Sequence, residues 1–150
     1  MKVLVALAVL LIAVAVGASA AGGLRLGLEF GNPNAVLIVR PAPLDFRIGY
    51  SFVNNQFIFL SADYRILDAK QLIDFVHFFF SAGAYTSLAF DPAAFDLGLR
   101  IPLGFQAFLF ENALELFLEL APTVQLYPEL LFDWQNIQGW IGFTIRLPKP

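Results

Sequence analysis

Apolar and polar residues alternate with a period of two through most of the chain. Over 95–106, Phe, Leu and Ile fill the odd positions, while Asp, Gly, Arg, Pro and Gln fill the even ones. The alternation resumes after 110–112, with leucine at positions 114, 116, 118 and 120. Successive side chains of a β-strand point to opposite faces, so this stretch predicts a long β-hairpin over 95–126.

A helix over 112–120 is the alternative for the second arm of this hairpin. Its residues are good helix formers, and Glu111, Glu115 and Glu119 follow one another at intervals of four. A helix would, however, distribute the four leucines over different faces. The strand is therefore the preferred interpretation.

The same alternation predicts five further strands, over 24–30, 46–52, 57–66, 74–89 and 138–147, and a short apolar run before two prolines predicts another over 35–40. Residues that favour turns separate them at 31–34, 41–43, 54–55 and 91–92. We expect a polar connection over 67–71, with that hairpin folding about residue 69, and the longest loop over 127–136. The hairpin arms are about ten residues long, enough for a tilted strand to cross a bilayer. The expected fold is all-β, an eight-stranded antiparallel up-and-down transmembrane β-barrel preceded by a helical signal peptide.

The composition favours a membrane environment. Of the 150 residues, 59% are hydrophobic and 14% charged, with a mean hydropathy of +0.72, which is too apolar for an ordinary soluble domain. The net charge of −3 gives no basis for binding nucleic acid. The absence of cysteine excludes disulfides, thiolate nucleophiles and Cys-ligated zinc.

The first twenty residues have the pattern of an export signal. Lys2 precedes an unbroken apolar run over 3–16, and Ala18-Ser19-Ala20 matches a small-x-small cleavage site. We expect residues 1–20 to be a signal peptide that forms a helix apart from the rest, and 21–150 to be the barrel domain. A retained membrane helix is the alternative.

Alternation alone does not distinguish a soluble barrel with an apolar interior from a membrane barrel with an apolar exterior. The polar parity combines glycines with charges of both signs. A narrow eight-stranded interior needs small residues to make room for long arginines, whereas a solvated surface does not. We therefore expect an interior charge network of five arginines and six acids: Arg25, Glu29, Asp45, Arg47, Asp63, Arg65, Asp96, Arg100, Glu115, Glu119 and Arg146.

In an even-stranded barrel both termini lie on the periplasmic side, so 31–34, 54–55, 91–94 and 127–136 become external connections. Four aromatic residues near strand ends are candidates for an interfacial girdle, although incidental packing would explain each of them equally well. They are Tyr64, Tyr127, Trp134 and Trp140.

The chain has one histidine, His77, which excludes a site built from several histidines. A hairpin folding about residue 69 would place His77 opposite Ser61 and near Asp63, as in a Ser-His-Asp triad. Without a second supporting motif, we expect an interior hydrogen bond instead. The sequence predicts no enzyme, no catalytic or cofactor-binding residue, and no metal site; it contains no phosphate-binding loop, calcium loop or nucleotide fingerprint.

Three segments carry a resemblance to a known group. They are the R-x-PLG segment Arg100–Gly104, the segment Asn112–Pro122 and the Gly-rich closing segment Gly139–Leu147. The chain resembles the small eight-stranded outer-membrane barrels of the OmpA/OmpX/OmpW type, and its second half is similar to an outer-membrane barrel family of unknown function. Under that resemblance Pro102 and Pro122 are expected within strands. Two features depart from it: the second strand is short, and the chain ends on Pro150 instead of an aromatic residue.

We therefore expect a protein of the cell outer membrane with a structural or membrane-integrity role and a plugged polar lumen. Two alternatives are a narrow channel for very small or apolar solutes and a soluble exported lipocalin-like binder. The expected partners are outer-membrane lipid and, during insertion, the barrel-assembly machinery. We expect a monomer.

Overall fold

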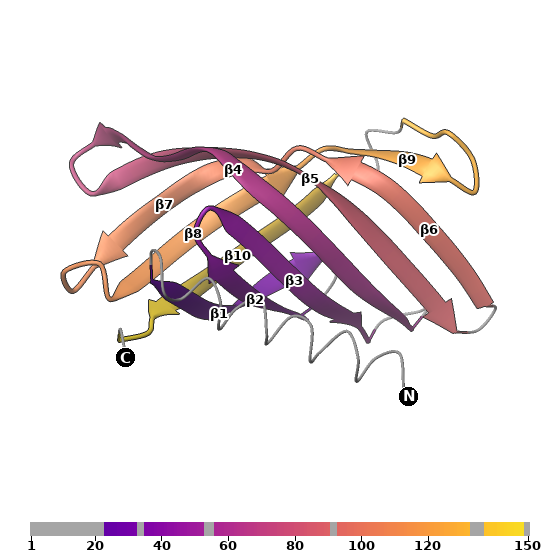
Figure 1. Cartoon of the computed structure of the whole chain (residues 1–150), viewed down its shortest axis with the longest axis horizontal. Helices are drawn as coiled ribbons and strands as arrows, with labels where there is room; N and C mark the ends of the chain where they lie inside the picture. Colours follow the sequence, from indigo (N-terminus) through magenta and orange to yellow (C-terminus); the bar gives the residue numbers. More distant parts are fainter. Residues whose placement is uncertain (1–22, 33–34, 53–55, 91–92, 133–136, 149–150) are drawn as a thin grey trace.

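The computed structural model describes residues 23–32, 35–52, 56–90, 93–132 and 137–148, which form a closed antiparallel β-barrel (Figure 1). The predicted signal peptide lies outside the described residues. Within them the structure has no helix, and so none able to cross a membrane. The strands are β1 (Leu24–Asn32), β2 (Ala35–Pro41), β3 (Leu44–Ser51), β4 (Phe57–Ile73), β5 (Val76–Phe90), β6 (Ala93–Arg100), β7 (Leu103–Leu109), β8 (Leu114–Ala121), β9 (Thr123–Tyr127) and β10 (Gln138–Arg146).

The ten strands correspond to eight strands of the barrel, because a proline divides each of two barrel strands into two segments. Pro102 separates β6 from β7, which both pair with β5, and Pro122 separates β8 from β9. Proline cannot donate a ladder hydrogen bond. The proline carbonyls still accept, from Ser81 N at 2.7 Å and from Ile101 N at 3.0 Å. The prediction of an eight-stranded antiparallel up-and-down barrel is confirmed, and the helix considered over 112–120 is wrong.

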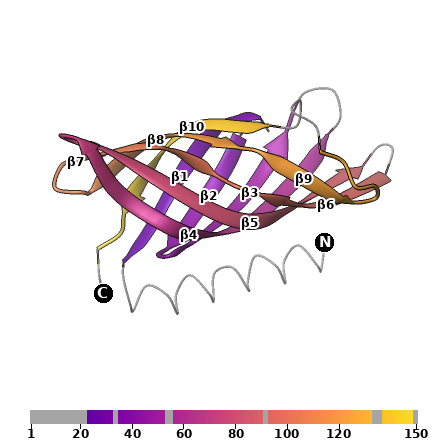
Figure 2. The same cartoon turned by 90° about the horizontal axis from the view of Figure 1, so that it is seen from above.

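The barrel closes where β1 pairs with β10, from Arg25 opposite Arg146 to Asn32 opposite Gly139. We call the end that carries Gly23 and Leu147 the terminal end. The β4–β5 hairpin and the β7–β8 turn lie at this end, while β6 and β9 extend toward the other end (Figures 1 and 2). Leu147 N donates to Leu24 O at 2.8 Å there.

The β4–β5 hairpin is longer than predicted. The expected connection over 67–71 is part of β4, and the chain turns at Asp74 and Phe75, with Asp74 at a φ of +44°. Irregularities in register between Arg65 and Leu67 and between Leu67 and Lys70 accommodate the stretch in which apolar and polar residues stop alternating. The prediction of a fold about residue 69 is therefore wrong, and His77 pairs with Gln71.

Strand β8 shows which parity faces outward. Leu116, Leu118 and Leu120 are 45–52% exposed, whereas Glu115 and Glu119 are at most 1% exposed. The apolar rows thus lie outside and the charges inside, as the composition of the polar parity predicted. The lipocalin-like alternative requires the opposite arrangement, and is wrong on this point.

The half of the interior away from the terminal end has an apolar core, which we call the aromatic layer. It consists of Val36, Phe59, Tyr85, Ala121 and Trp140, with Phe57 packed against it. Trp140 is 1% exposed, so its predicted place in a surface girdle is wrong. Tyr64 and Tyr127 are exposed on the outer surface, and Trp134 lies outside the described residues.

Small residues make this filling possible. A Cβ atom at Gly98 would lie 2.5 Å from the ring of Tyr85, and one at Gly142 would lie 2.8 Å from the ring of Phe117. Both distances are shorter than a carbon–carbon contact allows. Glycine at these positions therefore lets the aromatic rings lie against the barrel wall.

The β4–β5 register can be tested with cysteine pairs, because the natural chain has none. Oxidation of the double variant Gln71→Cys/His77→Cys should give an intramolecular disulfide, since directly opposite residues bring their Cβ atoms within about 5 Å. The matched pair Ser61→Cys/His77→Cys should stay reduced. Mass spectrometry of peptides with and without reductant distinguishes the outcomes. A disulfide in the second pair alone would show that the hairpin turns about residue 69, as the sequence predicted.

Candidate functional site

The centre of the interior is organised around Arg47, which β3 directs into the barrel. Its guanidinium contacts Glu29 of β1 at 3.0 Å, Glu119 of β8 at 2.6 Å and Asp63 of β4. Arg100 of β6 pairs with the same Glu119 and lies 3.2 Å from Asp63. All five side chains are at most 1% exposed. One buried cluster therefore joins five different strands.

A second cluster lies between this one and the terminal end. Asp45 of β3 accepts from Arg40 Nε at 2.7 Å and from Arg65 Nε at 3.1 Å. Arg40 also reaches Glu115 of β8 at 2.5 Å. Because Arg47 lies 3.7 Å from Asp45, the two clusters form one network, which we call the interior ion network.

The charges of this network nearly balance. Its buried members are the four arginines 40, 47, 65 and 100 and the five acids 29, 45, 63, 115 and 119. Burying an unpaired charge is costly, and an ion inside a protein is tolerated when a counter-ion and hydrogen bonds compensate its lost hydration. Here each arginine lies within salt-bridge distance of at least two carboxylates.

Aromatic rings cover the guanidinium groups on the side of the aromatic layer. The Arg100 guanidinium lies 4.6 Å from the centroid of the Trp140 ring, and that of Arg47 lies 5.8 Å from the same centroid. Arg65 lies 4.5 Å from the Phe79 ring. These are cation–π distances, so Trp140 joins the network to the aromatic layer, while Phe79, which is outside that layer, covers Arg65.

The structure places eight of the eleven sequence-predicted site residues in the network: Glu29, Asp45, Arg47, Asp63, Arg65, Arg100, Glu115 and Glu119. Arg25 lies at the rim of the terminal end, where its Nη2 donates to Asn112 O at 2.6 Å. Arg146 lies at the same rim, where its side chain is exposed and lines the cavity described below instead of joining the buried network. Asp96 is partly buried, and its backbone oxygen accepts from the Thr86 hydroxyl.

Sequence reasoning missed Arg40, which is 4% exposed and joins the two sides of the second cluster. Its neighbours on the inner face of β2 are Val36 and Ile38, so β2 lacks the alternation that identified the other inward charges. The only indication in the sequence that Arg40 points inward is that position 40 has the same parity as positions 36 and 38.

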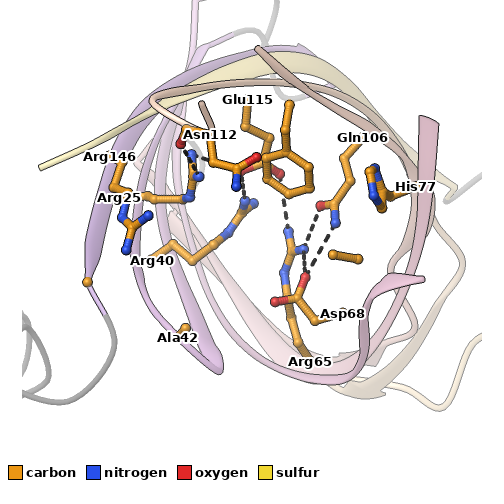
Figure 3. A pocket seen from close by; sticks show the side chains of 13 residues that line it. Arg25, Arg40, Ala42, Arg65, Asp68, His77, Gln106, Asn112, Glu115 and Arg146 are labelled. Carbon is orange, nitrogen blue, oxygen red and sulfur yellow. Dashed lines mark hydrogen bonds and ion pairs between the residues drawn. The ribbon is translucent and has the colours of Figure 1, made fainter. Parts of the chain in front are cut away.

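A cavity of about 380 Å³ opens at the terminal end (Figure 3). Charged and amide groups from several strands point into it, with Arg40 and Glu115 forming part of its floor. The lining residues are Gly23, Arg25, Arg40, Ala42, Arg65, Asp68, Ala69, His77, Gln106, Phe108, Asn112, Glu115 and Arg146. We call this space the terminal cavity.

His77 lines the terminal cavity, and its Nδ1 lies 3.1 Å from Phe75 O. Ser61 pairs across the ladder with Tyr85, eight residues further along β5, or about 26 Å at 3.3 Å per residue. The arrangement considered for a Ser-His-Asp triad is therefore wrong. In the part of the chain that the structure describes, no group of three or more His, Cys, Asp or Glu residues is arranged to hold a metal ion.

Comparison with known proteins adds no relative: no family model, curated protein or solved structure matches the chain.

The network predicts a strong effect of removing one charge. Glu119→Gln leaves Arg47 and Arg100 each short of a buried carboxylate, which typically costs about 3–5 kcal/mol. Urea unfolding of the detergent-solubilised protein should show this loss. Glu111→Gln is the matched control, because Glu111 is exposed in the β7–β8 turn and should change stability by less than about 0.5 kcal/mol. Equal stability of the two variants would contradict a network that stabilises the fold.

Proposed function

We propose that this protein is an outer-membrane β-barrel whose interior is plugged and whose role is structural, in maintaining the membrane. The observation that carries the proposal is the inverted distribution of side chains, with charges buried and large apolar side chains exposed. Water on the outside would make this distribution unfavourable, whereas lipid makes it favourable.

The apolar exterior extends around the barrel. Large hydrophobic side chains that are 40–63% exposed come from strands on every side, among them Leu28, Leu37, Leu99, Phe105, Leu118 and Ile141. A soluble monomer rarely exposes contiguous apolar surface beyond a few hundred Å². Hydrocarbon chains of lipid are the partner that such a surface, continuous around a closed sheet, would contact.

Two layers of side chains support a plugged interior. The interior ion network fills the middle of the barrel, and the aromatic layer packs directly against it through Trp140. None of the residues of the aromatic layer lines the terminal cavity. Eight-stranded barrels in general leave an interior just wide enough to be filled by side chains.

The topology supports an orientation. Both ends of the described chain lie at the terminal end, which corresponds to the periplasmic side in barrels with an even number of strands. We propose that the protein belongs with the small barrels of the OmpA/OmpX/OmpW type, is inserted by the barrel-assembly machinery and acts as a monomer. The prolines that interrupt β6–β7 and β8–β9 match what that resemblance implies.

The proposal is tested first by extraction and then by conductance. The protein should require detergent for extraction and migrate differently on gels before and after boiling, because a closed barrel resists unfolding in mild detergent. In planar bilayers the purified protein should give no steady current steps. Cells that lose the protein should become more permeable to apolar dyes, and expression of the wild-type chain should restore the barrier.

Other results would reject specific parts of the proposal. Recovery in the soluble fraction without detergent would reject the membrane barrel. Steady unitary openings would reject the plug and support the narrow channel. A double variant, Phe59→Ala/Trp140→Ala, removes two rings of the aromatic layer and should conduct more readily than Tyr64→Ala, which removes an exposed ring of the outer surface.

A further inference from the structure

The terminal cavity has more positive than negative groups. Four arginines line it, at positions 25, 40, 65 and 146, against the two acids Asp68 and Glu115. Figure 3 shows Arg25, Arg40 and Arg146 on one side of the cavity and Arg65 on the other. They come from β1, β2, β4 and β10, so the folded barrel brings these positive groups together from distant parts of the sequence.

The two acids are already engaged with the cavity wall. Glu115 Oε2 accepts from Arg40 at 2.5 Å and from the Thr144 hydroxyl at 2.7 Å. Asp68 accepts from Arg65 Nη1 at 2.7 Å. The other oxygen of Glu115, Oε1, has no hydrogen-bond partner among the residues described, so the two acids do not fully balance the four arginines but keep one acceptor in reserve.

Two buried donors of this cavity are unused. Arg40 Nη2 and Arg65 Nη2 are inaccessible to solvent and have no hydrogen-bond partner among the residues described. Both side chains are only 4% exposed, and Glu115 Oε1 lies 3.9 Å from Arg65 Nη2, within salt-bridge distance but too far for a hydrogen bond. An unsatisfied buried donor is unfavourable, and one on a charged group especially so.

Repulsion adds to this unfavourable arrangement. Arg25 lies close enough to both Arg40 and Arg146 to experience their positive charges, which oppose the attraction of Glu115. The carboxylate oxygen of Glu115 is 3.8 Å from Arg25, within salt-bridge distance but beyond hydrogen-bond distance. A bound anion would relieve the repulsion, and it would supply acceptors to the unused donors once the Arg40 or Arg65 side chain turns toward the cavity.

We propose that the terminal cavity is a binding site for a phosphate-class oxyanion, either inorganic phosphate or the phosphomonoester group of a lipid. A phosphate carries up to two negative charges and three or more acceptor oxygens in a tetrahedral arrangement, which suits guanidinium groups on opposite walls. A carboxylate offers two oxygens in one plane. Arginine forks bind phosphate through paired hydrogen bonds, and a space of about 380 Å³ is large enough for such a group.

The test is titration of the full barrel in non-ionic detergent with inorganic phosphate, followed by calorimetry and by the ³¹P line width. Wild type should bind, and raising the salt concentration should weaken binding. Arg146→Gln and Arg25→Gln should each weaken binding about tenfold. Arg146 is exposed at the rim, so its variant should retain the heat-modifiable gel shift of the folded barrel. Lys70→Gln is the matched control, removing one exposed positive charge outside the cavity without loss of binding.

A second titration distinguishes the two sources of the anion. Mixed micelles that contain phosphatidic acid are compared with micelles of detergent alone, and inorganic phosphate should compete with the lipid for the site. Tighter binding of the micellar lipid, lost in Arg146→Gln, assigns the site to a lipid headgroup; tighter binding of free phosphate assigns it to the soluble ion. Equal losses in Arg146→Gln and Lys70→Gln, or no binding of either probe by folded wild type, would overturn the proposal.

Discussion

Pairing of charges that are buried inside the barrel is the constraint on which the rest of this structure depends. Arg47 and Arg100 lie at the centre of the barrel, and their carboxylate partners come from β1, β4 and β8. An ion in that position is tolerated when the strands bring a counter-ion to it. The register of several strands is therefore coupled to a single cluster, because a shift of one residue in any strand would move a charge to the apolar exterior.

The small residues, the aromatic rings and the apolar exterior are consequences of holding that cluster inside the barrel. The aromatic rings beside the arginines need space, and the glycines at positions 98 and 142 provide it where a Cβ atom would collide with Tyr85 or Phe117. The aromatic rings in turn cover the guanidinium groups and separate them from the end opposite the terminal cavity. With the polar groups inside, the leucines and phenylalanines face outward, and it is this exterior that supports a place in a membrane.

Much of the architecture was readable from the sequence because a β-strand assigns alternate residues to alternate faces. That rule gives the number of barrel strands, their antiparallel order and the inward parity of Arg47, Asp63 and Glu119. Arg40 was not predicted as an interior charge, because its neighbours on the same face of β2 are apolar. The β4–β5 turn was misplaced because register irregularities keep the unpatterned stretch in the strand. Trp140 is an inward residue by parity, and only three-dimensional contacts show that it packs on arginines. The terminal cavity combines residues from seven strands and the turns, which no local pattern indicates.

The burial of charges inside the barrel and of leucines against lipid is tested most directly with single cysteines along β8, each carrying a nitroxide spin label, in the barrel reconstituted into lipid bilayers. Power saturation in oxygen and in a water-soluble nickel chelate measures exposure to lipid and to water. If lipid contacts the leucine row, oxygen accessibility should be high at 116, 118 and 120, and accessibility to both reagents should be low at 115, 117 and 119. Nickel accessibility at the leucine positions, together with oxygen accessibility at the glutamate positions, would contradict this arrangement.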